Sequence, residues 1–535
     1  MSRVTGEHEH PAALGEDRKQ VTKAAALISA GNVASRVLGL LREMVKSYFF
    51  GAGGAVSAFD VASQVPTMLY DLLAGGMLNS ALVPVFSDYT PAERRAEFQR
   101  LLSLLLSLLA VVLGAIIIAI ELAAPWVMRL LSSGLPPDYL RLATEMVRIT
   151  TPAILFLNVA GVLSAALYAL QRFERPALIA AVSNATLVLV VVLLGRTWLG
   201  ARSLALGLLA GSLAQVLIQW PALRDLHLTF VHPFRAHPAL LTIGKLYLPI
   251  GLGMLVDQAA VALSFNLASR TGPSGIAWMK YAATLIQFPL GMVVVAISTA
   301  ILPTLSRYAS DDEGERFRAT LAQGLRLVLI LVIPTALLMA LTAEPIVALL
   351  FQRGSFLPAD TEAVAMALRF SLPGLIFAAL DQPLIVAFYA RKDTWTPALV
   401  GAAMDLIYAL MVLVPLLFHP PVLWLIILAN SLKLSLHALT MLYLFERKVG
   451  RLSIYGVRRT ALLSLGASLL LVAALLPLRH FLPPHLPDGT AGTALFVGLA
   501  ALVGGLVYLV AMRAFGVEEM LLLREALLRR FRPLR

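Results

Sequence analysis

The sequence predicts an all-α polytopic membrane protein with about 14 transmembrane helices, built as two six-helix lobes followed by two further helices. Composition is the first reason: of 535 residues, 59% are hydrophobic and 14% are charged, and the mean hydropathy is +0.82. The second reason is that apolar runs of about 18–25 residues, long enough to cross a bilayer as helix, recur along the chain. The third is an internal repeat.

The apolar runs place the predicted spans in order along the chain. They cover residues 24–48, 57–88, 101–124, 141–170, 177–194, 204–222, 241–268, 277–308, 321–343, 361–390, 397–418, 422–445, 460–478 and 492–512. The predicted parts are a cytosolic N-terminal tail (1–23), a first lobe (24–235), a second lobe (236–450), the two added helices (451–512) and a cytosolic basic tail (513–535).

The net charge of +12 would suggest nucleic-acid binding in a soluble protein. Here most of the 43 Lys and Arg residues fall in segments that are cytosolic if the N-terminus lies inside. The excess is therefore the positive-inside signal, both termini are expected in the cytosol, and no nucleic-acid partner is expected. The absence of cysteine excludes disulfides and thiolate metal sites.

Three sequence matches recur in the same order about 220 residues apart. The end of the second span (82–89) matches the end of the eighth (302–308), residues 123–134 match 343–354, and residues 167–178 match 388–399. Because each copy holds six spans, both copies have the same orientation, related by an axis along the membrane normal. Transporters of this kind bind substrate between their lobes, near the middle of the membrane.

Ionised side chains are concentrated in the first predicted span, which indicates a hydrophilic interior. A charge inside a span costs about 2.5–3.5 kcal/mol, so it is retained where it faces protein or water. Arg36 and Glu43 lie on nearly one face of the helix, so Glu43 is expected to neutralise Arg36 in part. Arg42 and Lys46 lie on another face and are expected to be the freer cations.

The second predicted span carries Asp60 and Asp71 on one polar stripe. One interpretation is that these carboxylates pair with the cations of the first span and only hold the two helices together. The other is that at least one arginine stays available for an anionic group, because a guanidinium binds phosphate oxygens bidentately.

Fewer charges lie in the spans of the second lobe. Asp257 and Asp405 are candidates for a coupling-cation site, because a carboxylate deep in a span needs a counter-charge. A salt bridge to Lys280 or Lys433 is the alternative.

No catalytic motif occurs in the sequence. Most histidines lie in the N-terminal tail and loops (His8, His10, His232, His237, His419, His480 and His485), and neither HExxH nor a glycine-rich phosphate loop after a strand is present. The chain is therefore expected not to be an enzyme. No cofactor or metal is expected beyond a coupling cation and the membrane potential.

Several motifs together resemble those of the lipid II flippase family (MurJ, also called MviN). They include SRVLGLLRE (35–43), LVPVFSDY (82–89), QRFERP (171–176), ILPTLSRY (301–308), LFQRGSF (350–356) and FYARKDTWTP (388–397). The resemblance covers residues 24–450 and extends to the superfamily of multidrug extruders and polysaccharide-lipid flippases. It implies fourteen helices, a central cationic cavity, and a groove at the two added helices for a polyprenyl tail.

Residue by residue, the resemblance is complete in the first span and incomplete later, as in a divergent member. Ser35, Arg36, Gly39 and Arg42 match the first-helix motif of the family. In the second span, charged positions of the family fall at Ser57, Asp71 and Gly75, with Asp60 one turn after Ser57. In the eighth span, they fall at Ala283, Thr284 and Gln287, with Lys280 one turn before Thr284.

The function implied by the resemblance is transfer of undecaprenyl-diphosphate-linked peptidoglycan precursor, lipid II, across the bacterial cytoplasmic membrane. By alternating access, Arg36 and Arg42, with Lys46 and Lys280, are expected to engage the diphosphate. The membrane potential favours outward movement of negative charge by about 2.3 kcal/mol per charge per 100 mV.

Three alternatives stay open at this stage. The first is a flippase for another polyprenyl-diphosphate glycan. The second is a drug or cation antiporter that uses Asp257, Asp405 or Asp381. The third is a non-transporting scaffold for cell-wall synthesis enzymes, which are also candidate partners of a flippase.

Overall fold

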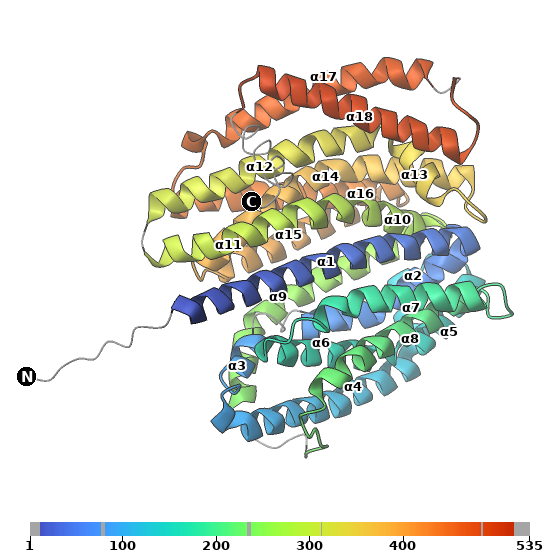
Figure 1. The fold of residues 1–535 in the computed structure, drawn as a ribbon. Coiled ribbons are helices and arrows are strands. Elements are labelled where there is room, and N and C mark those ends of the chain that lie inside the picture. The colour runs from blue at the N-terminus through green and yellow to red at the C-terminus, as the bar shows by residue number, and fades with distance from the viewer. Residues whose placement is uncertain (1–10, 76–80, 233–236, 312, 483–484, 518–535) are drawn as a thin grey trace, which may run out of the picture. The chain divides into compact units, whose positions relative to one another are not determined.

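The computed structural model describes residues 11–75, 81–232, 237–311, 313–482 and 485–517, whose regular elements are all helices (Figure 1). The α-helices are α1 (Pro11–Phe50), α2 (Gly54–Tyr70), α3 (Val83–Ser87), α4 (Arg95–Ser132), α5 (Pro137–Thr150), α6 (Ala153–Ala169), α7 (Ile179–Leu194), α8 (Arg202–Gln219), α9 (Pro238–Ser269), α10 (Gly275–Pro289), α11 (Val295–Ser310), α12 (Gly314–Leu341), α13 (Ala343–Phe351), α14 (Pro358–Ala390), α15 (Trp395–Leu413), α16 (Leu423–Lys448), α17 (Val457–Phe481) and α18 (Thr490–Ala514). The structure also contains the π-helical turns η1 (Asp71–Gly75) and η6 (Leu290–Val294), and the short 3-10 turns η3 (Ala92–Arg94), η4 (Pro176–Leu178), η5 (Trp220–Leu223), η7 (Pro415–Leu417) and η8 (Ser453–Tyr455).

The all-α polytopic class is confirmed, whereas the predicted number of fourteen spans is not. Within the described residues, 11 helices are long and apolar enough to cross a membrane, or up to 12 if α5 and α6, which meet at a bend of 41°, form one span. The first two predicted spans are not among them. Helix α1 carries the cluster of charges noted above, and α2 has 17 residues, followed by η1.

The ends of the chain differ from the sequence-based expectation in one respect. Helix α1 begins at Pro11, inside the predicted tail of residues 1–23, while residues 1–10 lie outside the described part. Most of the predicted basic tail, residues 518–535, also lies outside it. The predicted domain boundaries stay a prediction.

The chain forms two compact units, of which the first comprises Met1–Val45, Ser63–Ala124 and Glu145–Leu248. Its apolar core is built by α3, α4 and α6, where the rings of Phe86 and Phe98 meet edge to face at 5.6 Å. Helices α7 and α8 pack closely because a glycine faces the backbone: a Cβ at Gly211 would lie 2.8 Å from the carbonyl oxygen of Ser183. Small residues allow this kind of approach between membrane helices.

The second unit comprises Lys46–Ala62, Pro125–Thr144 and Pro249–Arg535. Helix α14 lies at its centre and packs against α10, α12 and α16. The C-terminal pair, α17 and α18, packs on α12 through a buried polar link. Tyr508 on α18 donates a hydrogen bond to the carbonyl oxygen of Ile330 on α12 (2.7 Å) and lies 2.8 Å from the hydroxyl of Ser464 on α17.

The two copies of the internal repeat share an unusual backbone feature. Gln171 and Lys392, which occupy matched positions, both have positive φ, 57° and 60°. In each copy, the backbone N–H of the next residue donates a hydrogen bond to the carbonyl oxygen five residues earlier. Arg172 N lies 2.8 Å from Leu167 O, and Asp393 N lies 3.0 Å from Phe388 O. Non-glycine residues rarely adopt this left-handed conformation, so the coincidence supports the repeat independently of side-chain identity.

A second shared feature is a π-helical turn in the second helix of each copy. The turn η1 follows α2, and η6 follows α10, about 220 residues later. Single π-turns inside helices frequently mark functional sites. Asp71, one of the predicted site residues, is the first residue of η1.

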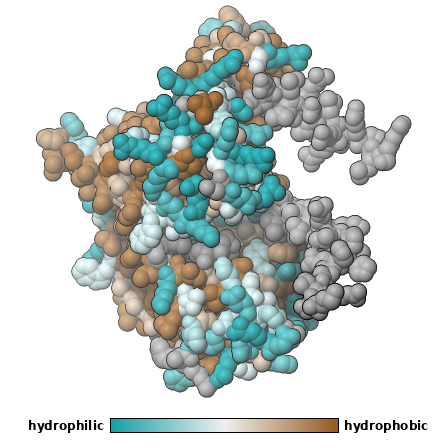
Figure 2. Space-filling view, turned by 90° about the vertical axis from the view of Figure 1, so that its left-hand side faces the viewer, coloured by the Kyte–Doolittle hydropathy of each residue, from teal (hydrophilic) through white to brown (hydrophobic). Residues whose placement is uncertain are grey.

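One end of the second unit is rich in hydrophilic side chains. Helix α11 ends and α12 and α17 begin on the left of Figure 1, and Figure 2 shows that side of the molecule with hydrophilic residues gathered over the helix ends. Many of the predicted cytosolic Lys and Arg residues lie in or next to the connections between α11 and α12 and between α16 and α17. The pattern agrees with the charge bias that the sequence predicts for the inner side.

In the first unit, connections after α6 and α8 are joined by an ion pair. Arg172 donates to both oxygens of Asp225, from Nη1 to Oδ1 (2.8 Å) and from Nη2 to Oδ2 (2.7 Å), and Arg95 also pairs with Asp225. The hydrogen bonds from Arg172 hold the pKa of Asp225 below its usual range. The sequence motif QRFERP thus contains Arg172, the arginine that links the connection after α6 to the connection after α8.

We predict that the first unit becomes less stable in acid, because protonation of Asp225 removes this ion pair. Because the folded pKa of Asp225 is lowered, its contribution is present above the usual aspartate value of about 4 and is lost as the pH falls through the folded pKa. Both side chains are more than a third exposed, so the contribution is about 0.5 kcal/mol. Thermal unfolding in detergent between pH 7 and 3 measures it. Asp225→Asn should flatten the decline, the control Glu174→Gln should not, and identical profiles for both variants would contradict the prediction.

Candidate functional site

The first-helix motif forms a polar face of α1 that lies against α7. Ser35, Gly39 and Arg42 are spaced four and three residues apart, so they share this face. Asn184 on α7 contacts all three: it accepts a hydrogen bond from Nη1 of Arg42 (3.1 Å) and donates to the carbonyl oxygen of Ser35 (3.3 Å). A Cβ at Gly39 would lie 3.6 Å from its Nδ2 atom. We call these four residues the α1–α7 polar face.

Arg42 is held on this face with part of its donor capacity used. Its Nε and Nη2 atoms donate to Oε1 of Glu43 at 3.1 and 2.8 Å. With the bond to Asn184, three of the five N–H groups of the guanidinium have acceptors among the described residues, which leaves two. The side chain of Arg42 is 37% exposed.

The expectation that Lys46 is one of the freer cations of α1 is wrong, and Arg42 is paired in part. Glu43 binds Arg42, its neighbour in sequence, because a long guanidinium reaches back along the helix to the adjacent carboxylate. Lys46 belongs to the second unit, where its Nζ lies 3.0 Å from Oδ1 of Asp60. Both side chains of this pair are at most 5% exposed, and the ring of Tyr281 covers the ammonium at 4.6 Å.

The pair of Lys46 and Asp60 therefore corresponds to the interpretation in which charges hold α1 and α2 together. An ammonium in a buried ion pair is not available to a diphosphate without breaking that pair. Within the same unit, Tyr281 also donates to the carbonyl oxygen of Gly51 (2.9 Å), so the surroundings of the pair are tied to α10.

The other predicted site residues are distributed over the two units. Arg36, half-buried, lies about 120° around α1 from Arg42, and Asp71 is half-buried at the start of η1. Lys280 on α10 lies 5.1 Å from the ring of Phe265 and lines a cavity of about 380 Å³ within the second unit. Ser35, Arg36, Gly39, Arg42 and Asp71 belong to the first unit, and Lys46, Asp60 and Lys280 to the second. Their part in binding a substrate stays a prediction.

The two carboxylates proposed for a coupling cation lie on either side of a lysine. Nζ of Lys433 on α16 lies 2.9 Å from Oδ1 of Asp405 on α15 and 4.0 Å from Oδ1 of Asp257 on α9. The alternative of a salt bridge to Lys433 thus describes the structure. No group of three or more His, Cys, Asp or Glu arranged to hold a metal occurs in the described part of the chain.

Two polar residues in the spans, Asn184 and His437, are not among the site residues predicted from the sequence. Asn184 is the only amide side chain in the apolar run 177–194, a signal that could have singled it out. His437 lies in the middle of the candidate span formed by α16, and it is absent from the histidines assigned to tails and loops. Its position inside an apolar helix was the available signal.

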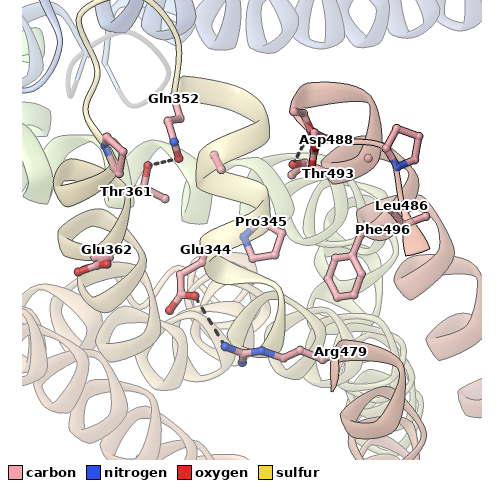
Figure 3. A pocket seen from close by; sticks show the side chains of 15 residues that line it. Glu344, Pro345, Gln352, Thr361, Glu362, Arg479, Leu486, Asp488, Thr493 and Phe496 are labelled. Carbon is pink, nitrogen blue, oxygen red and sulfur yellow. Dashed lines mark hydrogen bonds and ion pairs between the residues drawn. The ribbon is translucent and has the colours of Figure 1, made fainter. Parts of the chain in front are cut away.

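A larger cavity of about 480 Å³ lies where α13 and the start of α14 meet the connection between α17 and α18 (Figure 3). Glu344 lines this cavity and forms two salt bridges. The carboxylate of Glu344 accepts a hydrogen bond from Nη2 of Arg369 on α14 (2.9 Å) and lies 3.7 Å from Nη2 of Arg479 on α17. These bridges connect three helices. The cavity is therefore part of the junction by which the C-terminal helix pair packs on the rest of the second unit.

We predict that the Lys46–Asp60 pair is structural. Removing one buried partner leaves the other uncompensated, so Lys46→Met and Asp60→Leu should each lower the free energy of unfolding by about 3 kcal/mol. The double variant Lys46→Met/Asp60→Leu should recover most of this loss. Thermal unfolding in detergent gives the double-mutant cycle; additive losses, or a wild-type melting temperature for Lys46→Met, would show that the pair does not stabilise the fold.

Comparisons with known proteins agree with the resemblance stated from the motifs. The family model described as lipid II flippase MurJ matches residues 46–487. The lipid II flippase MurJ of Burkholderia cenocepacia is 29% identical over 74% of this chain and 79% of its own length. The probable lipid II flippase MurJ of Vibrio cholerae is 30% identical over 72% of this chain and 75% of its own.

Solved structures show the same fold. A lipid II flippase MurJ in an inward closed conformation aligns with a TM-score of 0.76 at 23% identity, covering 92% of this chain and 98% of that chain. A multidrug resistance MATE family transporter of the MOP superfamily, in an inward-facing conformation, aligns with a TM-score of 0.66 at 15% identity, covering 79% of this chain and 95% of that chain. The match of the family model over most of the chain identifies it: the chain belongs to the lipid II flippase MurJ family.

Proposed function

We propose that this chain is a lipid II flippase, which moves the undecaprenyl-diphosphate-linked peptidoglycan precursor from the inner to the outer leaflet of the bacterial cytoplasmic membrane. The observation that carries this proposal is the match of the family model over residues 46–487. Relatives named as lipid II flippases or probable lipid II flippases, about 30% identical over some three quarters of their length, support it further.

The chemistry of the lipid explains what a protein must supply. The polyprenyl tail is apolar and stays in the hydrocarbon throughout the transfer. The diphosphate and the disaccharide-pentapeptide are polar, and each group that enters hydrocarbon without a hydrogen-bond partner costs several kcal/mol. A flippase therefore has to offer donors and counter-charges to the head group and expose it first to one side of the membrane and then to the other.

The α1–α7 polar face is the part of the first unit best suited to a diphosphate oxygen. Arg42 offers two N–H groups, and Asn184 with Glu43 fixes the plane of the guanidinium. Preorganised guanidinium donors suit phosphate oxygens. Because Glu43 balances the charge of Arg42, the attraction for the lipid is moderate, which favours release on the far side. Arg36 on the same helix is the second guanidinium that we assign to the diphosphate.

The remaining expectations complete the proposal. The protein is a multi-pass protein of the cytoplasmic membrane with both termini in the cytosol, and it transports without catalysing a chemical reaction. An inside-negative potential favours outward movement of the diphosphate by about 2.3 kcal/mol per charge per 100 mV. Enzymes of cell-wall synthesis are its expected partners, because they make and consume this lipid.

Reconstitution tests the role of Arg42. In proteoliposomes that contain fluorescent lipid II, Arg42→Ala should lower the flipping rate at least tenfold, since hydrogen bonds to a charged group contribute about 1.5–3 kcal/mol. Glu43→Gln, which keeps the guanidinium and removes its counter-charge, should retain lipid II more tightly in a binding assay. The matched control Arg202→Ala removes an arginine that pairs with Glu145 at the exposed start of α8 and should flip at the wild-type rate.

Folding and specificity are controlled in the same assay. Arg42→Ala/Glu43→Gln removes both charges, so a loss of flipping in this variant at an unchanged melting temperature reflects the missing guanidinium rather than an unpaired carboxylate. Wild-type flipping by Arg42→Ala would contradict the assignment. Faster flipping of an undecaprenyl-diphosphate glycan without peptide than of lipid II would replace lipid II by that glycan as the substrate.

A further inference from the structure

A second polar cluster lies inside the second unit, one helical turn from Lys433. His437 follows Lys433 by four residues on α16, so both side chains lie on the same face of the helix. Nδ1 of His437 lies 2.8 Å from Oδ2 of Asp381 on α14, although at an angle outside that of a good hydrogen bond. Both side chains are nearly buried, with exposures of 14% and 11%.

Asp381 is incompletely satisfied in this position. The residue is 8% exposed, and its second oxygen, Oδ1, is buried without a hydrogen-bond partner among the described residues. A buried carboxylate oxygen with no donor is costly in a low-dielectric interior. A proton taken up by the pair relieves this cost, because it converts a buried pair with one negative charge into a neutral one.

The imidazole of His437 is the group that can take this proton. When Nδ1 carries hydrogen toward Asp381, the lone pair of Nε2 remains as an acceptor, and a Cβ built at Gly401 of α15 would lie 3.8 Å from that atom. Gly401 therefore lies beside Nε2. Protonation at Nε2 adds one positive charge and breaks no bond.

The surrounding charges favour a proton over a metal ion. Tyr389 on α14 interacts electrostatically with Asp381, and Lys433, one turn before His437 on α16, pairs with Asp405 on α15. The ammonium of Lys433 already occupies the place between Asp405 and Asp257 that a coupling cation would take, and it would repel a second cation there. His437, in contrast, carries a titratable group beside an unneutralised carboxylate.

We propose that Asp381 and His437 form a proton-binding site in the second unit, and that the ion exchanged by this unit during transport is a proton rather than a metal cation, with Lys433 as the fixed counter-charge of Asp257 and Asp405. The binding of the proton stands on the geometry above. Its use in transport rests on the proposed flippase function.

Proton binding is tested first, without transport. In the purified protein labelled with ¹³C- and ¹⁵N-histidine, the ring signal that disappears in His437→Gln belongs to His437. This signal should change with pH in the wild-type protein, and Asp381→Asn should alter that response. A ring signal that does not respond to pH, or a response that Asp381→Asn leaves unaltered, would overturn the proton site. His437→Asn provides the assignment if His437→Gln fails to fold.

The use of the proton is tested in proteoliposomes with fluorescent lipid II. A pH gradient should change the wild-type flipping rate several-fold, and a sodium gradient of the same size should leave it unchanged. His437→Gln should lose the response to the pH gradient, while the control His480→Gln, at the end of α17, should keep it. A response to sodium, or an unchanged pH response in His437→Gln, would overturn the coupling. Failure of every protein to flip lipid II refutes the flippase proposal and the coupling, whereas the titration still decides on the proton site.

Discussion

Ionised side chains inside apolar helices need a partner of opposite charge, and this constraint organises both units of the molecule. A lone charge in a span costs several kcal/mol, so helices that carry one must approach a helix that carries its counterpart. Lys46 on α1 meets Asp60 on α2, and Lys433 on α16 meets Asp405 on α15, whereas Arg42 meets Glu43 within α1. The pair of Arg42 and Glu43 is partly exposed, whereas the pair of Lys46 and Asp60 is buried.

The two units share backbone features that their side chains do not reveal. Gln171 and Lys392 differ in chemistry, yet both adopt the same left-handed conformation at matched positions of the repeat. The π-turns η1 and η6 also occupy matched positions with unrelated sequences. The copies have therefore kept their geometry while their ionised groups diverged, toward guanidinium groups on α1 and toward Lys433 and His437 on α16.

The sequence predicted the helices well because their cause is local: a long apolar run between polar connections needs no tertiary information. Helices α14 and α18 begin and end within three residues of their predicted limits. Charge pairing could not be predicted in the same way. Glu43 lies on nearly the same face as Arg36 in helical projection, yet it accepts hydrogen bonds from Arg42, its neighbour in sequence. Asn184 and His437 are detectable in the sequence as polar residues in apolar runs, but their partners are known only when α7 is placed beside α1 and α14 beside α16.

The central claim is that this chain carries lipid II across the cytoplasmic membrane. The most direct measurement is made in bacterial cells depleted of their own lipid II flippase, in which an impermeant reagent reports how much lipid II is accessible in the outer leaflet. Our account predicts that expression of the chain restores accessible lipid II and growth. Lipid II that stays in the inner leaflet, although the chain is present and folded in the membrane, would contradict it.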